Sequence, residues 1–177
     1  MIYLVRHGEA AANWGEHPDP GLSTKGQLQA ESAAQRLSDL GADNLICSPM
    51  RRCRETAAPF AQKLGRVTMV NPDVSEIVTP QGVEDRVTWL RDLMAGQWPD
   101  EMMAWRRGAY HAVCDLPDGT AIFSHFVAIN AIVGMAKQDR SVLIFKPDHC
   151  SITRLEHDGN GGLCVAELGG DAVTKIL

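Results

Sequence analysis

The hydrophobic pattern alternates between short apolar runs and longer segments with helical spacing. Apolar runs at 1–5, 45–47 and 121–123 are typical of strands buried on both faces, which lose the alternation of polar and apolar positions. Further strands are predicted at 67–70 and 142–145, and a hairpin that closes one sheet edge at 151–155 and 163–168. This order of short strands and longer helical segments favours an α/β fold with a largely parallel sheet.

Helices are predicted between these strands. Residues 22–26 lead into a helix that reaches about Leu40, because small and apolar residues recur along one helical face. Ser48 is expected to be the N-cap, and Pro49 the first residue, of a helix that ends near Leu64. The other predicted helices cover 82–95, 100–114 and 126–135.

Polar groups follow three of the predicted strands. Arg6-His7 follows the first, an arginine-rich segment at 48–54 follows the second, and Ser124-His125 follows the run at 121–123. In open parallel sheets, ligands bind at the carboxyl ends of the strands, so these groups converge if the strands are neighbours. An imidazole beside fixed positive charges indicates a site that handles phosphate.

Composition narrows the possibilities for location and partners. The 177 residues, of which 45% are hydrophobic and 22% charged, indicate one globular domain over 1–177. No apolar stretch is long enough to span a bilayer, and the N-terminus lacks a signal-peptide pattern, so a cytoplasmic location is expected. The net charge of −5 argues against nucleic acid or a membrane as partner, whereas a small anion remains compatible.

The cysteines and histidines do not suggest a metal. The five cysteines are odd in number and form no C-x-x-C pair, so neither a disulfide framework nor a zinc site is indicated. No H-E-x-x-H motif occurs, and arginines around His7 would repel a cation. We therefore expect no metal and no cofactor. Cys53 lies in the arginine-rich segment, which is expected to lower the pKa of its thiol.

Four motifs occur in an order that resembles the histidine phosphatase superfamily, also called the phosphoglycerate mutase-like fold. They are Arg6-His7-Gly8-Glu9, L-S-T-K-G-Q-L-Q-A at 22–30, S-P-M-R-R-C-R-E-T-A at 48–57, and Ser124-His125. The resemblance covers nearly the whole chain. It implies a three-layer α/β/α sandwich with a mostly parallel central sheet.

The resemblance also implies roles for four residues. His7 would be the nucleophile, and Arg6 and Arg52 would hold the phosphate. Arginine forks bind the nonbridging oxygens and offset their charge, which allows a neutral imidazole to attack phosphorus and form a phosphohistidine. A protonated His125 would donate to the phosphoryl oxygens.

The remaining assignments follow weaker matches. Asn13 falls where the family places an asparagine that contacts phosphate, while Ala10 replaces a usual Ser or Thr. Glu76 begins a segment like the family's E-I-x-x-G-x-W-E-G but lacks the tryptophan, and it is the candidate general acid and base. Glu84 and Asp85 are alternatives for that role.

Several residues near the motifs have no expected part in the chemistry. Glu9 belongs to the signature by position, but no role can be derived for it. Arg51 and Arg54 are expected to form surface salt bridges. His149 is expected to be a structural histidine, and the alternative is a position at the rim of the pocket. Trp14, in the loop after the signature, is a candidate for lining the pocket.

The resemblance implies metal-independent hydrolysis of a small-molecule phosphate ester through phosphorylated His7. Neither the substrate nor the oligomeric state can be read from the sequence. Three alternatives stay open. They are a phosphoglycerate mutase, for which the chain is short; a protein-phosphohistidine phosphatase, a branch that tends to lack the acid; and a noncatalytic phosphate-binding module.

Overall fold

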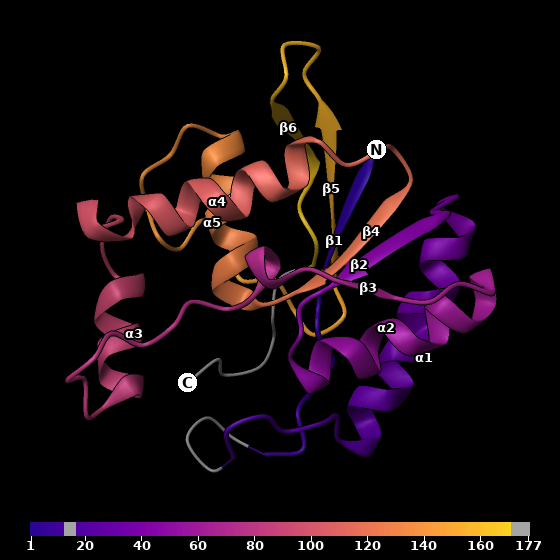
Figure 1. Ribbon diagram of the computed structural model, residues 1–177, viewed down its shortest axis with the longest axis horizontal. Coiled ribbons are helices and arrows are strands. Elements are labelled where there is room, and N and C mark those ends of the chain that lie inside the picture. The colour runs from indigo at the N-terminus through magenta and orange to yellow at the C-terminus, as the bar shows by residue number, and fades with distance from the viewer. Residues whose placement is uncertain (13–16, 171–177) are drawn as a thin grey trace.

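A six-stranded sheet lies at the centre of the computed structural model, which describes residues 1–12 and 17–170 (Figure 1). The strands are β1 (Ile2–Arg6), β2 (Asn44–Cys47), β3 (Met69–Val70), β4 (Thr120–Ser124), β5 (Ile152–His157) and β6 (Leu163–Glu167). Their order is β3-β2-β4-β1-β5-β6. The first four strands are parallel, and β5 and β6 run antiparallel at one edge, which confirms the predicted α/β fold and closing hairpin.

Helices cover both faces of the sheet. They are α1 (Thr24–Asp39), α2 (Arg51–Leu64), α3 (Arg86–Met94), α4 (Met103–Cys114) and α5 (Phe126–Ala136), with 3-10 turns η1 (Pro72–Val74) and η2 (Asp100–Met102). In β1, Tyr3 and Val5 pack against α1 and α2, whereas Ile2 and Leu4 pack against α4 and α5. This two-sided burial accounts for the apolar runs and gives the three layers.

The strand predicted at 142–145 does not form. The side-chain oxygen of Asn130, a buried residue of α5, instead accepts hydrogen bonds from the backbone N–H groups of Ile144 and Phe145, at 2.8 and 3.1 Å. Hydrophobic patterning detects that this segment is largely apolar. It does not show that a helix side chain, rather than a neighbouring strand, satisfies the backbone.

The predicted start of α2 is also wrong. The helix begins at Arg51, with Met50 rather than Ser48 at the N-cap position. The Ser48 hydroxyl lies 2.8 Å from Nε2 of His125, and it accepts a longer hydrogen bond of 3.3 Å from the Met50 N–H. The serine therefore makes a turn and contacts a histidine instead of capping the helix.

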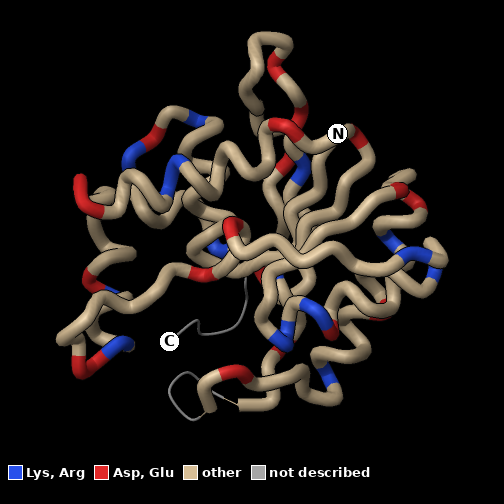
Figure 2. Tube along the Cα trace, viewed as in Figure 1, with Lys and Arg blue, Asp and Glu red and all other residues tan. Residues whose placement is uncertain are grey.

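The charged residues are distributed over many elements. Figure 2 shows Lys and Arg interspersed with Asp and Glu along the trace. In the part of the chain that the structure describes, no helix is both long and apolar enough to cross a membrane.

Candidate active site

The register between β1 and β4 brings two distant motifs together. Arg6 pairs with Ser124 in this parallel ladder, so His7 and His125 leave the two strands at the same level. The backbone N–H of His7 donates to the carbonyl oxygen of Ser124 at 3.0 Å. The two imidazole rings, whose centroids are 5.3 Å apart, meet edge to face at the carboxyl end of the sheet.

The hydrogen bonding of His7 defines which ring nitrogen is available. Its Nδ1 lies 2.8 Å from the carbonyl oxygen of Gly8, and because a carbonyl can only accept, Nδ1 carries the proton. Burial, followed by the nearby His125, Arg52 and Arg6, lowers the pKa of His7 well below its ordinary value. His7 is therefore neutral at physiological pH, with an unprotonated Nε2.

His125 is held in the opposite tautomer. Its Nδ1 lies 3.1 Å from Nη2 of Arg52, which can only donate, so Nε2 carries the proton and donates to Oγ of Ser48 at 2.8 Å. Burial, together with the charges of Arg52 and Arg6, lowers the pKa of His125 well below its ordinary value. The expectation of a protonated His125 is wrong for this arrangement, because desolvation and two cations oppose a further positive charge.

Arg6 is a buried cation fixed on several sides. Its Nη1 donates to the carbonyl oxygen of Pro147 at 2.9 Å, Nη2 contacts Nε2 of His149 at 3.1 Å, and Cζ lies 5.2 Å from the centroid of the Phe126 ring. Burial lowers the pKa of Arg6 to about 10, which leaves it charged at neutral pH. Its Nε is buried and has no hydrogen-bond acceptor among the described residues.

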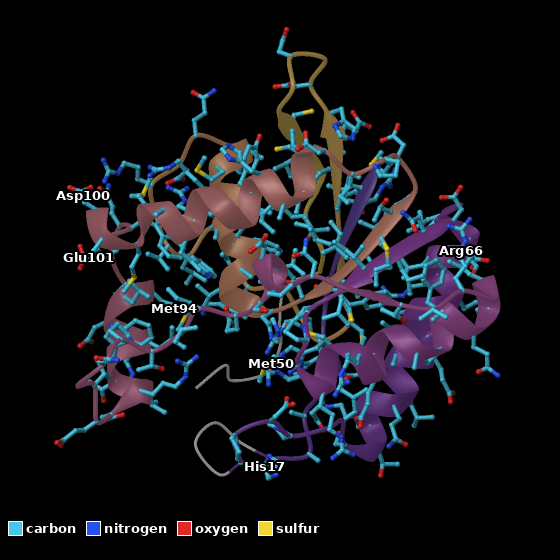
Figure 3. All side chains as sticks on the ribbon, in the orientation of Figure 1. His17, Met50, Arg66, Met94, Asp100 and Glu101 are labelled. Atoms are coloured by element: carbon cyan, nitrogen blue, oxygen red, sulfur yellow. The ribbon has the colours of Figure 1, made fainter. Side chains whose placement is uncertain are left out.

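Of the three arginines at the start of α2, only Arg52 contacts His125 among the described contacts. Its side chain is 14% exposed, and its Nη1 lies 4.0 Å from the carboxylate of Asp19. Arg51 forms an exposed salt bridge of 2.7 Å with Glu55, as predicted, and Arg54 is exposed. Met50, labelled in Figure 3, marks the start of this helix.

Glu76 reaches the site from the segment after η1. The Ser124 hydroxyl donates to the carbonyl oxygen of Val74 at 2.7 Å, which ties η1 to the end of β4. The carboxylate of Glu76 accepts hydrogen bonds from the N–H groups of Val127 and Ala128, each at 3.2 Å, in the first turn of α5. The acid candidate is thereby fixed at the first turn of α5, which follows His125 in the chain.

The environment of Glu76 differs from that of the two alternatives. Burial raises the pKa of Glu76, although backbone hydrogen bonds and the charges of Arg52 and Arg86 oppose the shift. Glu84 is exposed. Asp85 is the exposed N-cap of α3, where hydrogen bonds from the first turn lower the pKa of its carboxyl. Of these three carboxyls, only Glu76 is partly buried and close to the site arginines.

The 22–30 motif anchors the signature loop. A Cβ added to Gly8 would lie 2.7 Å from the carbonyl oxygen of Gly26, and a Cβ on Gly26 would overlap the carbonyl oxygen of Glu9. The Glu9 carboxylate accepts from the Ser23 hydroxyl and from Nζ of Lys25, both at 2.9 Å. Glu9, for which the sequence suggests no role, thus links the loop to the start of α1.

A second link runs from α2 to His7. The buried Thr56 hydroxyl donates to the carbonyl oxygen of Arg52 at 2.6 Å and accepts from the Gly8 N–H at 3.0 Å. Gly8 in turn accepts from Nδ1 of His7. The tautomer of the imidazole and the first turn of α2 therefore belong to one hydrogen-bonded chain.

Residues 2–167 match the histidine phosphatase superfamily, branch 1. The chain belongs to this superfamily. It is 30% identical over 202 aligned residues to the probable phosphoglycerate mutase GpmB of Erwinia tasmaniensis, with 97% of this chain and 93% of the relative covered.

Solved structures of other proteins share the fold of this chain. The phosphoserine phosphatase of Entamoeba histolytica gives a TM-score of 0.77 at 17% identity, covering 96% of each chain. A mycobacterial glucosyl-3-phosphoglycerate phosphatase gives 0.75 at 17% identity, covering 97% of this chain and 99% of the other. The predicted family and its phosphoglycerate mutase-like fold are confirmed.

Sequence reasoning missed part of this candidate site. Thr56 follows Arg52 by four residues on α2, a spacing that places both on one helical face and was a usable signal. For His149, a place at the pocket rim is only the alternative reading, whereas the structure puts its imidazole against Arg6. Asn13 and Trp14 lie outside the described residues.

The expectation for Cys53 is wrong in sign. Its Sγ lies 3.4 Å from Nε2 of His125, and burial raises the pKa of the thiol well above its ordinary value despite the charge of Arg52. The cysteine packs against the site as an un-ionised thiol. Among the described residues, no group of three His, Cys, Asp or Glu side chains is arranged to hold a metal ion.

Proposed function

We propose that the protein is a metal-independent phosphomonoesterase that hydrolyses a small phosphorylated metabolite in the cytoplasm, through a phosphohistidine on His7. The observation that carries this proposal is the tautomer of His7. Its Nδ1 is committed to Gly8 and its pKa is lowered, so an unprotonated Nε2 lies beside the guanidinium groups of Arg6 and Arg52. This is the state that a nucleophilic imidazole requires.

The pocket is suited to binding the phosphoryl group of the substrate. A phosphomonoester is anionic and repels nucleophiles, and two fixed arginines offset that charge before and during attack. Each terminal nitrogen of Arg6 has a second N–H beyond those that contact Pro147 and His149, and these are the donors that a phosphoryl oxygen would use. A bound dianion would also raise the pKa of His125 and favour its donating form.

The chemistry proceeds in two steps. In the first, Nε2 of His7 attacks phosphorus in line, so that a P–N bond forms as the ester P–O bond breaks, and Glu76 gives its proton to the leaving oxygen. In the second, Glu76 takes a proton from water as the water oxygen attacks phosphorus, and the P–N bond breaks to release inorganic phosphate. The raised pKa of Glu76 supports its role as the acid that begins this cycle.

The proposed partner is a small phosphate ester rather than nucleic acid or a membrane. The net charge of −5 disfavours polyanionic surfaces, while the positive charge at the site is confined to a few buried or partly buried side chains. The structural neighbours are named for phosphoserine and glucosyl-3-phosphoglycerate, both small phosphorylated metabolites.

Hydrolysis of an aryl phosphate in the presence of a chelator tests the proposal. We expect turnover that the chelator does not change and that His7→Ala abolishes. Rapid quenching with labelled substrate should trap an acid-labile phosphoryl group on His7. Undiminished turnover by His7→Ala would refute the nucleophile, and phosphate binding without turnover would favour a noncatalytic module.

Phosphoglycerate mutase activity is a second candidate, favoured by the 30% identity with a probable phosphoglycerate mutase over 93% of its length. In a mutase, the phosphoryl group of His7 returns to a second substrate oxygen rather than to water. Incubation with 3-phosphoglycerate separates the two activities. A mutase forms 2-phosphoglycerate faster than free phosphate, whereas a phosphatase does not.

A further inference from the structure

A third histidine contacts the phosphate-binding residues. His149 lies in the loop before β5, and its side chain is 17% exposed. Its Nε2 is 3.1 Å from Nη2 of Arg6, and its ring centroid is 6.0 Å from that of His7. None of the four motifs includes this residue.

The direction of the contact with Arg6 follows from the chemistry of the donor. A guanidinium has no acceptor, so Nε2 of His149 accepts and the proton of the imidazole is on Nδ1. That nitrogen lies 4.0 Å from the carboxylate of Asp148. The neutral imidazole is the form that can hold the arginine.

The loop therefore fixes both terminal nitrogens of one arginine. Nη1 of Arg6 donates to the carbonyl oxygen of Pro147, and Nη2 donates to His149 two residues further on. Each terminal nitrogen has a second proton that these two contacts leave unused. The guanidinium is held from one side, and several donors remain for an anion.

We propose that His149 is a positioning residue that aims the guanidinium of Arg6 at the phosphoryl group of the substrate. This inference rests on the proposed function. A long arginine side chain has many rotamers, and an acceptor at one terminal nitrogen removes part of that freedom before the ligand arrives.

The surroundings of His149 make its neutral form important. Arg6 and Lys25 contribute positive charge to this region, Asp148 and Glu9 contribute negative charge, and His7 is the neighbouring imidazole. Protonation of His149 would remove the acceptor and place a second positive charge against Arg6. Burial and the charge of Arg6 lower the pKa of His149 to about 4, so this does not occur at neutral pH.

Two substitutions of similar size test the proposal. His149→Gln keeps an acceptor at about the reach of Nε2, whereas His149→Met fills the same space without an effective one. We expect His149→Met to weaken the binding of inorganic phosphate and raise KM for an aryl phosphate about tenfold, near the lower end of the effect of losing a hydrogen bond to a charged donor. We expect His149→Gln to stay within about twofold of the wild type, because the acceptor is restored.

A double-mutant cycle shows whether His149 acts through Arg6. In an Arg6→Lys background the fork is absent, so His149→Met should weaken phosphate binding by less than about twofold. A merely structural role would give the same loss in both backgrounds. Phosphate affinity is measured by calorimetry and needs no turnover.

The outcomes separate this inference from the proposed function. Equal losses for His149→Gln and His149→Met, or no loss for either, would overturn the positioning role while the wild type still hydrolysed phosphate esters. A wild type that binds phosphate without hydrolysing it would refute the proposed activity. The double-mutant cycle of His149 and Arg6 would then decide the positioning role from phosphate affinity alone. A wild type that neither binds phosphate nor turns over would refute both.

Discussion

Replacing Glu76 with Gln should impair hydrolysis more for an ester with a poor leaving group than for one with a good leaving group. The change keeps the size of the side chain but removes its ability to transfer a proton. An alkyl oxygen needs a proton as it leaves, whereas a nitrophenyl oxygen leaves as a stable anion. The loss of kcat/KM should therefore be large for an alkyl phosphate and small for the aryl ester.

The magnitude follows from the role and from the contacts. A general acid contributes about 10²–10⁴-fold, or about 3–5 kcal/mol of barrier, which is the loss expected for the alkyl ester. The carboxylate oxygens of Glu76 accept from the N–H groups of Val127, Ala128 and Ile77. The amide of Gln has one accepting oxygen, so at least one of these N–H groups loses its acceptor, at about 1–3 kcal/mol of stability. Thermal melts of the variant define a temperature at which it is fully folded.

The assay compares kcat/KM for the two esters, because this ratio reports the steps up to ester cleavage. Water attack on the phosphohistidine is common to both substrates and does not enter. Glu84→Gln is the matched control, since Glu84 is exposed and should change neither value by more than about twofold. Equal losses on both esters for Glu76→Gln would remove Glu76 from the acid role.

Three further predictions concern the supports of the site. Thr56→Val leaves the Gly8 N–H without its acceptor, so it should lower the free energy of unfolding by about 1–3 kcal/mol and reduce kcat/KM. Thr56→Ser keeps the hydroxyl and should stay near wild type. Denaturant titration and steady-state kinetics test this, and a Thr56→Val variant with unchanged stability and kcat/KM would contradict the link. Gly26→Ala forces a methyl group against the Glu9 carbonyl and should cost about 1–3 kcal/mol by the same titration, whereas an unaffected variant would mean that the loop yields freely. Because the pKa of His149 is lowered to about 4 from 6.5, the unfolded chain binds more protons between these values, so stability falls as the pH drops through that window. His149→Gln should remove about 2 kcal/mol of the decline between pH 7 and about pH 4.5, measured by melts, and an unchanged decline would contradict the lowered pKa.

The strands that carry the site were predictable because of where they lie. β1 and β4 are buried on both faces, so their sequences are continuous apolar runs that end at Arg6 and Ser124. The apolar segment at 142–145 looks similar in sequence, but its backbone is satisfied by Asn130. The hydrophobic pattern of a sequence indicates which segments are buried, but not which group forms hydrogen bonds with their backbone.

The site residues that belong to short motifs at strand ends were predictable. Residues whose position or pKa depends on tertiary contacts were not. His7, Arg52 and His125 are located by such motifs. The contact of His149 with Arg6 depends on the path of an irregular loop, which has no periodicity to interpret. The sign of the pKa shift of Cys53 depends on burial exceeding the effect of an adjacent arginine, and only the packed structure shows that balance.

The proposed nucleophile and the proposed acid are held by parts of the fold that differ in how firmly they are anchored. His7 follows β1, which is paired with a neighbouring strand on each side, whereas Glu76 follows a single 3-10 turn joined to β4 through Ser124 and Val74. Substitutions in the segment at 71–85 can therefore change the reach and the proton affinity of the acid while the central strands fold unaltered. Under the proposed function, the range of accepted leaving groups can therefore diversify without any change around His7.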